Sequence, residues 1–237
     1  MDCATQAEKT GIVRGHVDEG VLTLTDRCLC SVARSAHDTI VNWVGDRPDE
    51  QTLLALDAPL GWPVGQRALI VHEAGVGPPA SAEAMFRRDT DRFVTEQMRQ
   101  RPLDVGADRI ARTAHAALAL LASLRETLSD AIPLAWAPDF SSHVAAIEVY
   151  PAATLKGRGF ISKGYKKREQ IAIRSRIVQQ LSTVCQIVHG GDLVAEADVL
   201  DAAVCVIAGY DFVAGRAAPP ENAESARCEG WIWVVPP

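Results

Sequence analysis

The 237-residue sequence has no long apolar run, no excess of basic residues and no glycine-rich phosphate loop. No apolar stretch reaches the roughly 20 residues that cross a bilayer, and no charged segment followed by an apolar one opens the chain, so we expect no membrane span and a cytoplasmic location. With 24 Lys and Arg against 30 Asp and Glu, the net charge is −6. Any nucleic-acid partner must therefore contact a local basic patch, and the missing phosphate loop argues against an ATP site.

The six cysteines and six histidines lack the spacing of a zinc site. Only Cys28 and Cys30 are close together, and no second pair completes their C-x-C spacing. Free, buried thiols are therefore the expectation. The run Ser141-Ser142-His143 is not by itself a nucleophile and base arrangement, which disfavours a serine or cysteine hydrolase.

Apolar patterning predicts an α/β protein with a mixed sheet. Residues 10–32 alternate apolar and polar side chains around Asp18-Glu19-Gly20, which is typical of a β-hairpin. Further strands are predicted at 51–57, 144–149 and 229–237. Helices are predicted at 34–45, 108–128 and 193–208, and another helix follows the basic segment and ends near residue 184. Strands that alternate with helices after a hairpin imply a mixed sheet covered by helices.

Residues 61–106 have poor periodicity, Gly and Pro punctuation and several Arg-Asp clusters. We expect them to form a long, partly helical insertion within a single domain that spans 1–237. Long insertions of this kind often carry function.

Acidic residues stand at the ends of predicted elements. Asp57 and Glu148 each come where a buried strand runs into a proline turn, and Asp2 immediately precedes the hairpin. Asp198 and Asp201 are three residues apart, so they share one face of the last helix. Because sites in α/β sheets form at strand ends, we expect these carboxylates to meet.

Several carboxylates brought together repel one another unless a cation neutralises them, and hard oxygen ligands suit Mg²⁺ or Mn²⁺. Two such ions would clamp the attacking and leaving oxygens of a phosphodiester, which is hydrolytic nuclease chemistry. Simpler interpretations remain open at this stage. Asp57 stands before Ala58-Pro59, so it could simply accept hydrogen bonds from backbone amides of that turn. Asp198 could be a first-turn residue that interacts favourably with the helix dipole, and Glu148 could be a structural hydrogen-bond acceptor. Asp201 lies deeper in its helix, where capping explains less.

Basic residues gather in one segment despite the acidic total. Eight of the 24 Lys and Arg residues lie between 156 and 176, and they are Lys156, Arg158, Lys163, Lys166, Lys167, Arg168, Arg174 and Arg176. The segment is compatible with phosphate contacts or with a solvated helix face, since only Phe160 and Tyr165 offer bases a stacking surface. In "FRRDTD", Arg87 and Arg88 either order the insertion through ion pairs or steady a substrate phosphate.

Seven segments together carry a resemblance to a known family. They are "DCATQAEKTG", "LLALDAPLGWP", "FRRDTD", "IEVYPAATL", "GYKKR", "DVLDAAVCVIAGYD" and "EGWIWVVP", spread from residue 2 to 236. With them the chain resembles the family called domain of unknown function 429, whose members are often described as predicted nucleases of the ribonuclease H-like fold. The resemblance implies a five-stranded mixed sheet with flanking helices. Because Asp2 follows Met1 directly, we expect its strand to be truncated.

The resemblance also implies a set of site residues. A first-strand Asp, an acid after the fourth strand and an acid on the final helix bind metals in that fold, which here are Asp2, Asp57 and Asp201, with Asp198 as a companion. Glu148 belongs to the family's own pattern, and we expect it to act as a further catalytic residue that completes or tunes the metal shell. The expected function is a nuclease that uses Mg²⁺ or Mn²⁺ to activate water, with the predicted substrate contacts at Arg87, Arg88, Lys163, Lys166, Lys167 and Arg168. The alternative is a catalytically silent module that binds nucleic acid or a protein.

Overall fold

The fold begins with the predicted antiparallel hairpin. The computed structural model describes residues 1–106 and 108–237, and in it β1 (Gly11–Asp18) pairs with β2 (Val21–Leu29). Glu19 and Gly20 both have positive φ angles, 47° and 78°. A two-residue turn of this kind matches the right-handed twist of the strands that it joins.

The strands form two small sheets. In the first, β1, β2 and the short β5 (Gln186–Ile187) lie in the order β1-β2-β5. In the second, β3 (Thr52–Leu56) pairs in parallel with β4 (Val144–Glu148). The α/β class is confirmed, whereas the strands divide into sheets of three and two.

Residues 1–3 connect these two sheets. Asp2 forms an antiparallel bridge with Gly11 of β1 and a parallel bridge with Asp57 just after β3. The peptide N–H of Asp2 donates to the carbonyl of Gly11 at 3.0 Å, and that of Asp57 donates to the carbonyl of Met1 at 3.0 Å. The start of the chain therefore acts as a very short strand between β1 and β3.

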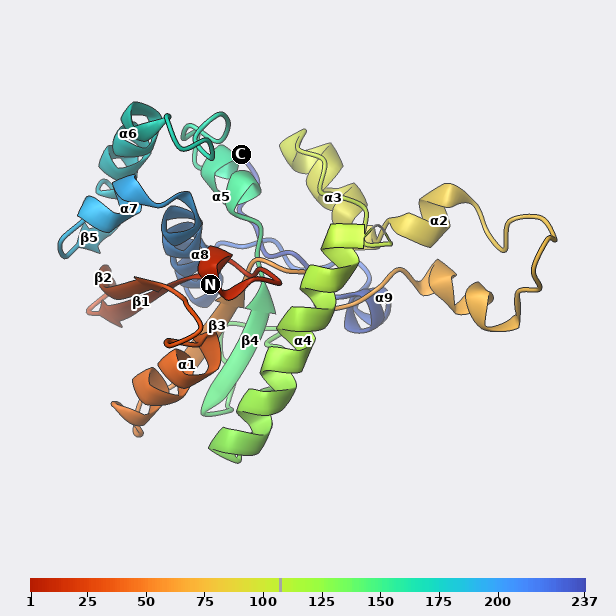
Figure 1. Ribbon diagram of the computed structural model, residues 1–237, viewed down its shortest axis with the longest axis horizontal. Coiled ribbons are helices and arrows are strands. Elements are labelled where there is room, and N and C mark those ends of the chain that lie inside the picture. The colour runs from red at the N-terminus through yellow and green to blue at the C-terminus, as the bar shows by residue number, and fades with distance from the viewer. Residues whose placement is uncertain (107) are drawn as a thin grey trace.

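Helices cover both faces of the strands (Figure 1). On one face, α1 (Ala36–Gly45) and α4 (Asp108–Leu128) pack their apolar sides on β1, β3 and β4. On the other face, α8 (Ala197–Val213) contacts β1, β2 and β3. Behind α8 lie α5 (Pro151–Gly157), α6 (Ile171–Leu181) and α7 (Gly191–Ala195).

The last long helix differs from the prediction. The sequence pattern predicted an amphipathic helix at 193–208, but the structure breaks it into α7 and α8, and α8 is buried almost all round. Its side chains are covered by the strands on one side and by α5, α6 and α7 on the other, so no solvated face is left.

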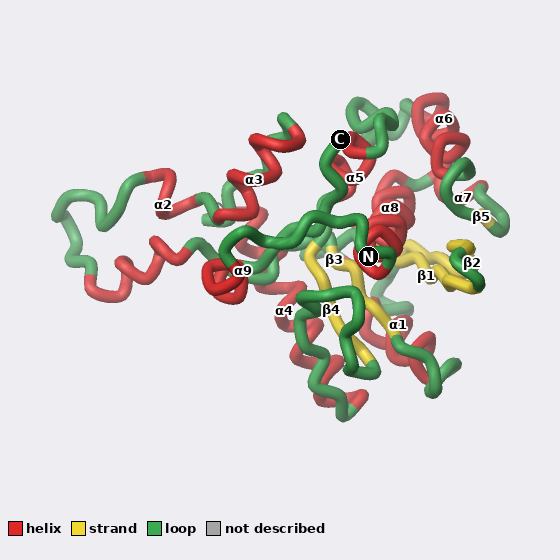
Figure 2. The backbone as a smooth tube through the Cα atoms, turned by 180° about the vertical axis from the view of Figure 1, so that it is seen from behind, coloured by secondary structure: helices red, strands yellow, loops and turns green. Residues whose placement is uncertain are grey.

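The predicted strand at 229–237 is also wrong. The tail makes only a single bridge, between Ile232 and Glu148, while Trp231 and Trp233 are buried in the core around α8. Seen from behind, the C-terminus lies beside α5 (Figure 2). There the carbonyl of Val235 approaches Gly157 so closely that a Cβ on that glycine would lie only 2.1 Å away.

The segment 61–106 projects from the rest of the molecule as an arm (Figure 1). It contains the 3-10 helix η2 (Val64–Val71) and the helices α2 (Ala82–Phe86) and α3 (Asp89–Met98). Helix α3 returns to the body of the protein and packs against α5 and α9 (Ala223–Glu229). A further short 3-10 helix, η1, covers Ala7–Lys9. None of the helices in the described part of the chain has the length and apolarity needed to traverse a membrane.

Candidate metal and catalytic site

Backbone pairing places Asp2 beside Asp57. Both residues sit in the bridge between residues 1–3 and the end of β3, and Pro59 follows too soon for β3 to continue. Paired residues in a parallel ladder project their side chains to the same face of the sheet. Two predicted ligands that are 55 positions apart in the sequence are thus neighbours.

The first turns of α8 bring two more carboxylates to this point. Gly11, the β1 partner of Asp2, packs so tightly on α8 that a Cβ there would lie 2.1 Å from the carbonyl oxygen of Asp198. Asp201 follows one turn later and is fully buried, with 0% of its surface exposed. A glycine on β1 therefore allows the helix to deliver both acids.

The loop between α5 and α6 supplies a tyrosine and a lysine to the same acids. The hydroxyl of Tyr165 donates to Oδ1 of Asp201 at 2.6 Å, and Nζ of Lys166 lies 2.7 Å from Oδ2. The lysine contact is close but poorly aligned, since Oδ2 has no hydrogen-bond partner among the described residues. The buried Arg174 holds this loop by donating to the carbonyls of Tyr165, Lys167 and Arg168.

The pKa values reflect crowding of negative charge. Burial, together with the Asp57 and Asp201 carboxylates, raises the pKa of Asp2 to about 9. Burial and Asp201 raise the pKa of Asp57 to about 7, and they raise that of Asp198 as well. Burial alone would lower the pKa of Lys166, but Asp201 and the other acids outweigh it and raise that pKa. The ammonium groups of Lys166 and Met1 do not offset four carboxylates.

The chemistry of this cluster, hereafter the acidic cluster (Asp2, Asp57, Asp198 and Asp201), suits a hard divalent cation. All of its ligand atoms are oxygens, and Oδ2 of Asp201 is a buried acceptor without a hydrogen bond among the described residues. In this conformation, however, no group of three or more Asp, Glu, His or Cys side chains within the described residues is arranged to hold a metal ion. Lys166 occupies the polar space next to Asp201 instead.

Glu148 is bound by Arg88, which corresponds to the structural alternatives left open for both residues, a hydrogen-bond acceptor and an ion-pairing arginine. Nη2 of Arg88 donates to Oε1 of Glu148 at 2.7 Å, and Nη1 donates to Oε2 at 2.9 Å. Oε2 also accepts the N–H of Leu60 at 2.9 Å. Arg88 completes its five bonds with Asp91 and the carbonyl of Glu229, and it is only 1% exposed. All five donors of this arginine are used inside the protein, which leaves none for a substrate phosphate, and three hydrogen bonds occupy most of the acceptor positions of Glu148.

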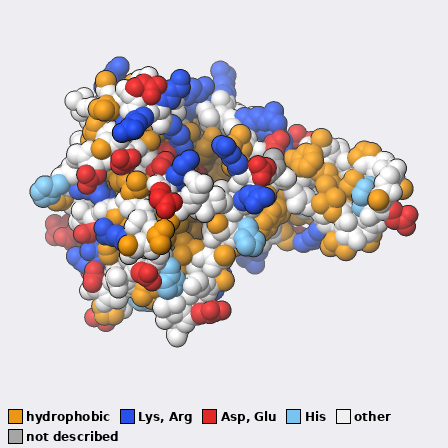
Figure 3. Space-filling view, in the orientation of Figure 1, with side chains coloured by type: hydrophobic (Ala, Val, Ile, Leu, Met, Phe, Trp, Pro, Cys, Tyr) orange, Lys and Arg blue, Asp and Glu red, His pale blue; other side chains and the backbone are white. Residues whose placement is uncertain are grey.

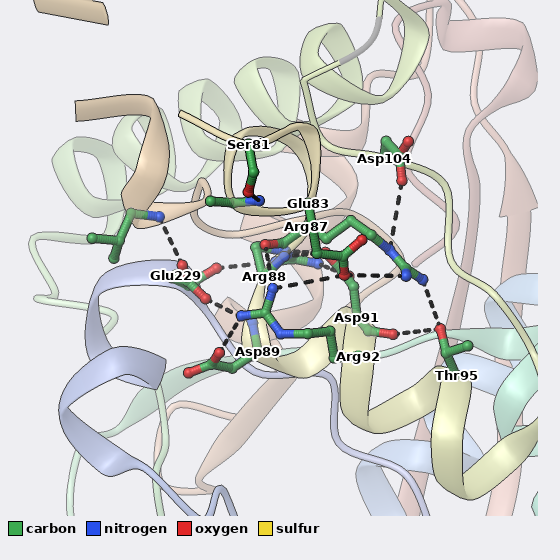
Figure 4. A network of polar contacts seen from close by, with 12 residues as sticks. Ser81, Glu83, Arg87, Arg88, Asp89, Asp91, Arg92, Thr95, Asp104 and Glu229 are labelled. Atoms are coloured by element: carbon green, nitrogen blue, oxygen red, sulfur yellow. Dashed lines mark hydrogen bonds and ion pairs between the residues drawn. The ribbon is translucent and has the colours of Figure 1, made fainter. Parts of the chain in front are cut away.

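Arg87 lines a cavity that contains no member of the acidic cluster. This cavity, of about 620 Å³, lies between the arm and α9. Arg87 points toward Asp104 and Thr95, and Nη2 donates to the Thr95 hydroxyl at 2.9 Å (Figure 4). On the same wall, Glu229 accepts the backbone N–H groups of Val64 and Asp89, each at 2.7 Å. These contacts fasten the arm to α9.

The other predicted substrate contacts lie on the loop before α6. Lys163, Lys167 and Arg168 are exposed there, and basic side chains gather over the α5 and α6 region in the space-filling view (Figure 3). Arg158 is instead paired with Asp211, and Lys156 donates to the carbonyl of Arg99 at 2.9 Å. The available positive charge is therefore concentrated beside the acidic cluster.

A protein-family profile described as "Protein of unknown function (DUF429)" matches residues 2–225. The chain belongs to this family. No curated protein and no solved structure matches it. The matched range includes all four members of the acidic cluster, together with Glu148 and the loop that carries Tyr165 and Lys166.

The sequence did not reveal the structural roles of three residues in this DUF429 chain. Tyr165 was considered only as a stacking surface and Lys166 only as a substrate contact, yet both bind Asp201. Arg174 was counted with the basic patch but is buried under the loop. The segment "GYKKR" could have indicated these roles, because it places a hydrogen-bond donor and a cation next to each other in one loop, and both contact Asp201.

We expect Arg88→Met to destabilise the fold by about 3–5 kcal/mol, because it leaves the buried Glu148 and Asp91 without their cation. Urea unfolding measures the change. Arg92→Met serves as the control, since that arginine is 36% exposed, and it should cost at most about 1 kcal/mol. Adding Glu148→Gln to Arg88→Met should recover part of the loss. Simple additivity of the two substitutions would contradict the pairing.

Stability should fall as pH rises, because of Asp2 and Asp57. Their pKa values in the folded protein, about 9 and about 7, lie above the ordinary value of 3.8. Between these pH values the folded state retains protons that the unfolded chain releases. The free energy of unfolding therefore begins to fall above about pH 4, and the loss is complete above about pH 7 for Asp57 and above about pH 9 for Asp2.

Asp57→Asn should therefore raise the urea midpoint at pH 9 in metal-free buffer and change it little at pH 4. The exposed Asp139→Asn is the matched control and should follow the wild-type pH profile. An Asp57→Asn variant that is equally destabilised at both pH values would argue against mutual repulsion.

Proposed function

We propose that this protein is a divalent-metal-dependent phosphodiesterase that acts on nucleic acid, that is, a nuclease. The observation that carries the proposal is the convergence of four carboxylates from three separate segments on one point, with raised pKa values for Asp2, Asp57 and Asp198. A fold has no structural reason to bury so much like charge, and perturbed carboxylates cluster at functional sites.

We also propose that the strands form an extended ribonuclease H-like arrangement. The order supporting this is β2, β1, residues 1–3, β3 and β4, in which Asp2 bridges to both neighbours. The first three members are antiparallel and the last three parallel. In this arrangement Asp2 lies on the central strand, Asp57 on its neighbour and Asp201 on the helix that crosses them.

Each residue of the site would have a separate role in this mechanism. Asp2, Asp57 and Asp201 would hold Mg²⁺ or Mn²⁺, with Asp198 alongside. A bound ion would supply Lewis acidity toward the phosphodiester and toward a nucleophilic water. Tyr165 fixes the orientation of Asp201 through its hydrogen bond. The exposed Lys163, Lys167 and Arg168 would position the phosphate backbone by charge.

Lys166 favours a second candidate, a catalytically silent module that binds nucleic acid or a protein partner. Its ammonium lies against Asp201, where a metal would be needed, and a permanent internal cation would leave the cluster inactive. The side chain is nevertheless 62% exposed along its length. A side chain with that much contact with water is free to leave, so we favour the metal-dependent enzyme with Lys166 displaced on binding.

Calorimetric titration with Mg²⁺ and Mn²⁺ tests the metal site. Asp57→Asn should weaken binding by about tenfold or more, which corresponds to at least ~1.4 kcal/mol. Lys166→Met should strengthen it, because the ion no longer competes with the ammonium, whereas the exposed neighbour Lys167→Met should change little. A wild type that binds neither ion at millimolar concentration removes the enzyme proposal.

Cleavage assays on single-stranded DNA, duplex DNA and RNA with Mn²⁺ then separate the two candidates. Activity that is lost in Asp57→Asn supports the nuclease. Metal binding without cleavage of any substrate supports the silent module.

The salt dependence of nucleic-acid binding tests the basic loop. Substituting Lys163, Lys167 and Arg168 together by Ala should reduce the slope of log K against log salt concentration by roughly 2–3, since each phosphate contact contributes about 0.7–0.9. Fluorescence anisotropy at several salt concentrations measures the slope. Lys156→Ala is the control, because that ammonium is held by the carbonyl of Arg99. An unchanged slope in the triple variant would place the binding surface elsewhere.

A further inference from the structure

The two cysteines of the C-x-C motif lie on one face of the hairpin sheet, at the end of β2. Cys28 is paired with Ile12 of β1. The peptide N–H of Cys30 donates to the carbonyl of Thr10 at 2.8 Å, so the antiparallel pairing continues past the last residue of β2. Residues two apart in a strand project to the same side. Both side chains therefore enter the apolar core under α1, where Cys28 is 8% exposed and Cys30 is 2% exposed.

The two sulfur atoms are in direct contact. The thiol of Cys30 donates a hydrogen bond to the sulfur of Cys28, and the exposed Arg34 places a positive charge nearby. Together they lower the pKa of Cys28 to about 6, against the opposing effect of burial. Burial raises the pKa values of three further buried thiols, which are Cys3, Cys185 and Cys205. Cys28 therefore differs from them in favouring the thiolate, which is the nucleophilic form.

A pair of sulfur atoms in contact can bind a soft metal ion or form a disulfide. Within the described residues, no third Cys, His, Asp or Glu joins the pair in an arrangement that would hold a metal ion. A disulfide needs only the two sulfur atoms. Two residues of a strand span about 6.6 Å, which is near the upper limit of the Cα separations that a disulfide allows. Closing the bond therefore requires the end of β2 to contract, and a strained disulfide of this kind is easily reduced.

The surroundings of the pair permit this contraction and select a small oxidant. Strand β2 ends at Leu29, and the turn that follows is exposed, with Val32 90% exposed, so few contacts resist a local change. The sulfur atoms themselves are nearly covered. Oxidation depends on exposure as well as on thiolate character, so a molecule close to water in size has better access to Cys28 than a peptide disulfide has.

We propose that Cys28 and Cys30 form a reversible disulfide in response to hydrogen peroxide. The Cys28 thiolate attacks one peroxide oxygen, so an S–O bond forms, the O–O bond breaks and hydroxide leaves with the proton that Cys28 had released, as water. The Cys30 sulfur then attacks the sulfenic acid, an S–S bond forms, and the S–O bond breaks. The thiol proton of Cys30 leaves with that hydroxide as a second water. The two thiols lose two electrons, which reduce the peroxide.

The redox site does not depend on the nuclease function. It is nevertheless connected to the acidic cluster, because Leu29, between the two cysteines, is paired with Gly11, whose carbonyl accepts the N–H of Asp2 at 3.0 Å. If both proposals hold, contraction of β2 at Leu29 would be transmitted through Gly11 to Asp2.

Trypsin isolates the pair for the test, because cleavage after Arg27 and Arg34 yields the peptide CLCSVAR, which contains no other cysteine. The full chain is treated with micromolar hydrogen peroxide at pH 7, its free thiols are alkylated in urea, and the peptide is identified by mass spectrometry. We expect the peptide to lose two hydrogen atoms and to take up no alkyl group. Millimolar glutathione should then restore both alkylation sites, because the disulfide is strained.

Two variants separate the roles of the cysteines. In Cys30→Ala, Cys28 should stop at the sulfenic acid, which dimedone captures. The pH at which its reaction is half-maximal should also rise from about 6 toward about 8.5, because the hydrogen bond to the thiolate is lost. Cys228→Ser, which removes the exposed cysteine, is the control and should form the disulfide at the wild-type rate.

The wild-type measurement alone can overturn the proposal, so it stands whether or not a variant folds. A peptide that keeps both alkylation sites after peroxide treatment would do so. A main product in which Cys28 is a sulfinic acid, or is bonded to any cysteine other than Cys30, would also overturn it. So would a disulfide that millimolar glutathione does not reduce. An unchanged pH profile in a folded Cys30→Ala variant would contradict the role of the Cys30 thiol.

Discussion

The backbone pairing of Met1 and Asp2 is the constraint on which the rest of the structure depends. Through a few hydrogen bonds, these residues join a three-stranded sheet to a two-stranded one. The same bonds place Asp2 beside Asp57 and hold β1 and β3 on either side of residues 1–3. The joining of the two sheets and the acidic cluster share this origin, because the same backbone hydrogen bonds that hold residues 1–3 between β1 and β3 also bring Asp2 to Asp57.

Electrostatics distinguishes the two groups of buried acids. Glu148 and Asp91 share one arginine whose five donors are all used, so each carboxylate is in direct contact with a cation, although burial still raises the pKa of Glu148. In the acidic cluster, only Asp201 is in direct contact with a lysine, the exposed Lys166, and the pKa values of Asp2 and Asp57 are raised by burial and by the neighbouring carboxylates. Compensated charge stabilises the attachment of the arm, whereas uncompensated charge is available for a ligand.

Local pattern was enough to predict several elements. The helix at 108–128 is confirmed with both ends, since its apolar residues recur at helical spacing and pack on α1 and the strands. The hairpin and the strands before Asp57 and Glu148 were predicted from similar signals. Predictions failed where a distant segment decided the outcome. The burial of α8 on all sides depends on six other elements, and the tail forms a bridge through one residue only, so neither feature could be predicted from local periodicity.

By itself, the sequence determined which residues stand at the ends of elements, because hydrophobic period and proline placement are local properties. It therefore nominated Asp57, Glu148 and Asp201 as candidate site residues. Only the tertiary structure decided between them, since the partner of Glu148 lies 60 residues away and the hydroxyl that binds Asp201 lies 36 residues away. Which charges are neutralised and which remain open depends on contacts between distant segments, and periodicity carries no record of those contacts.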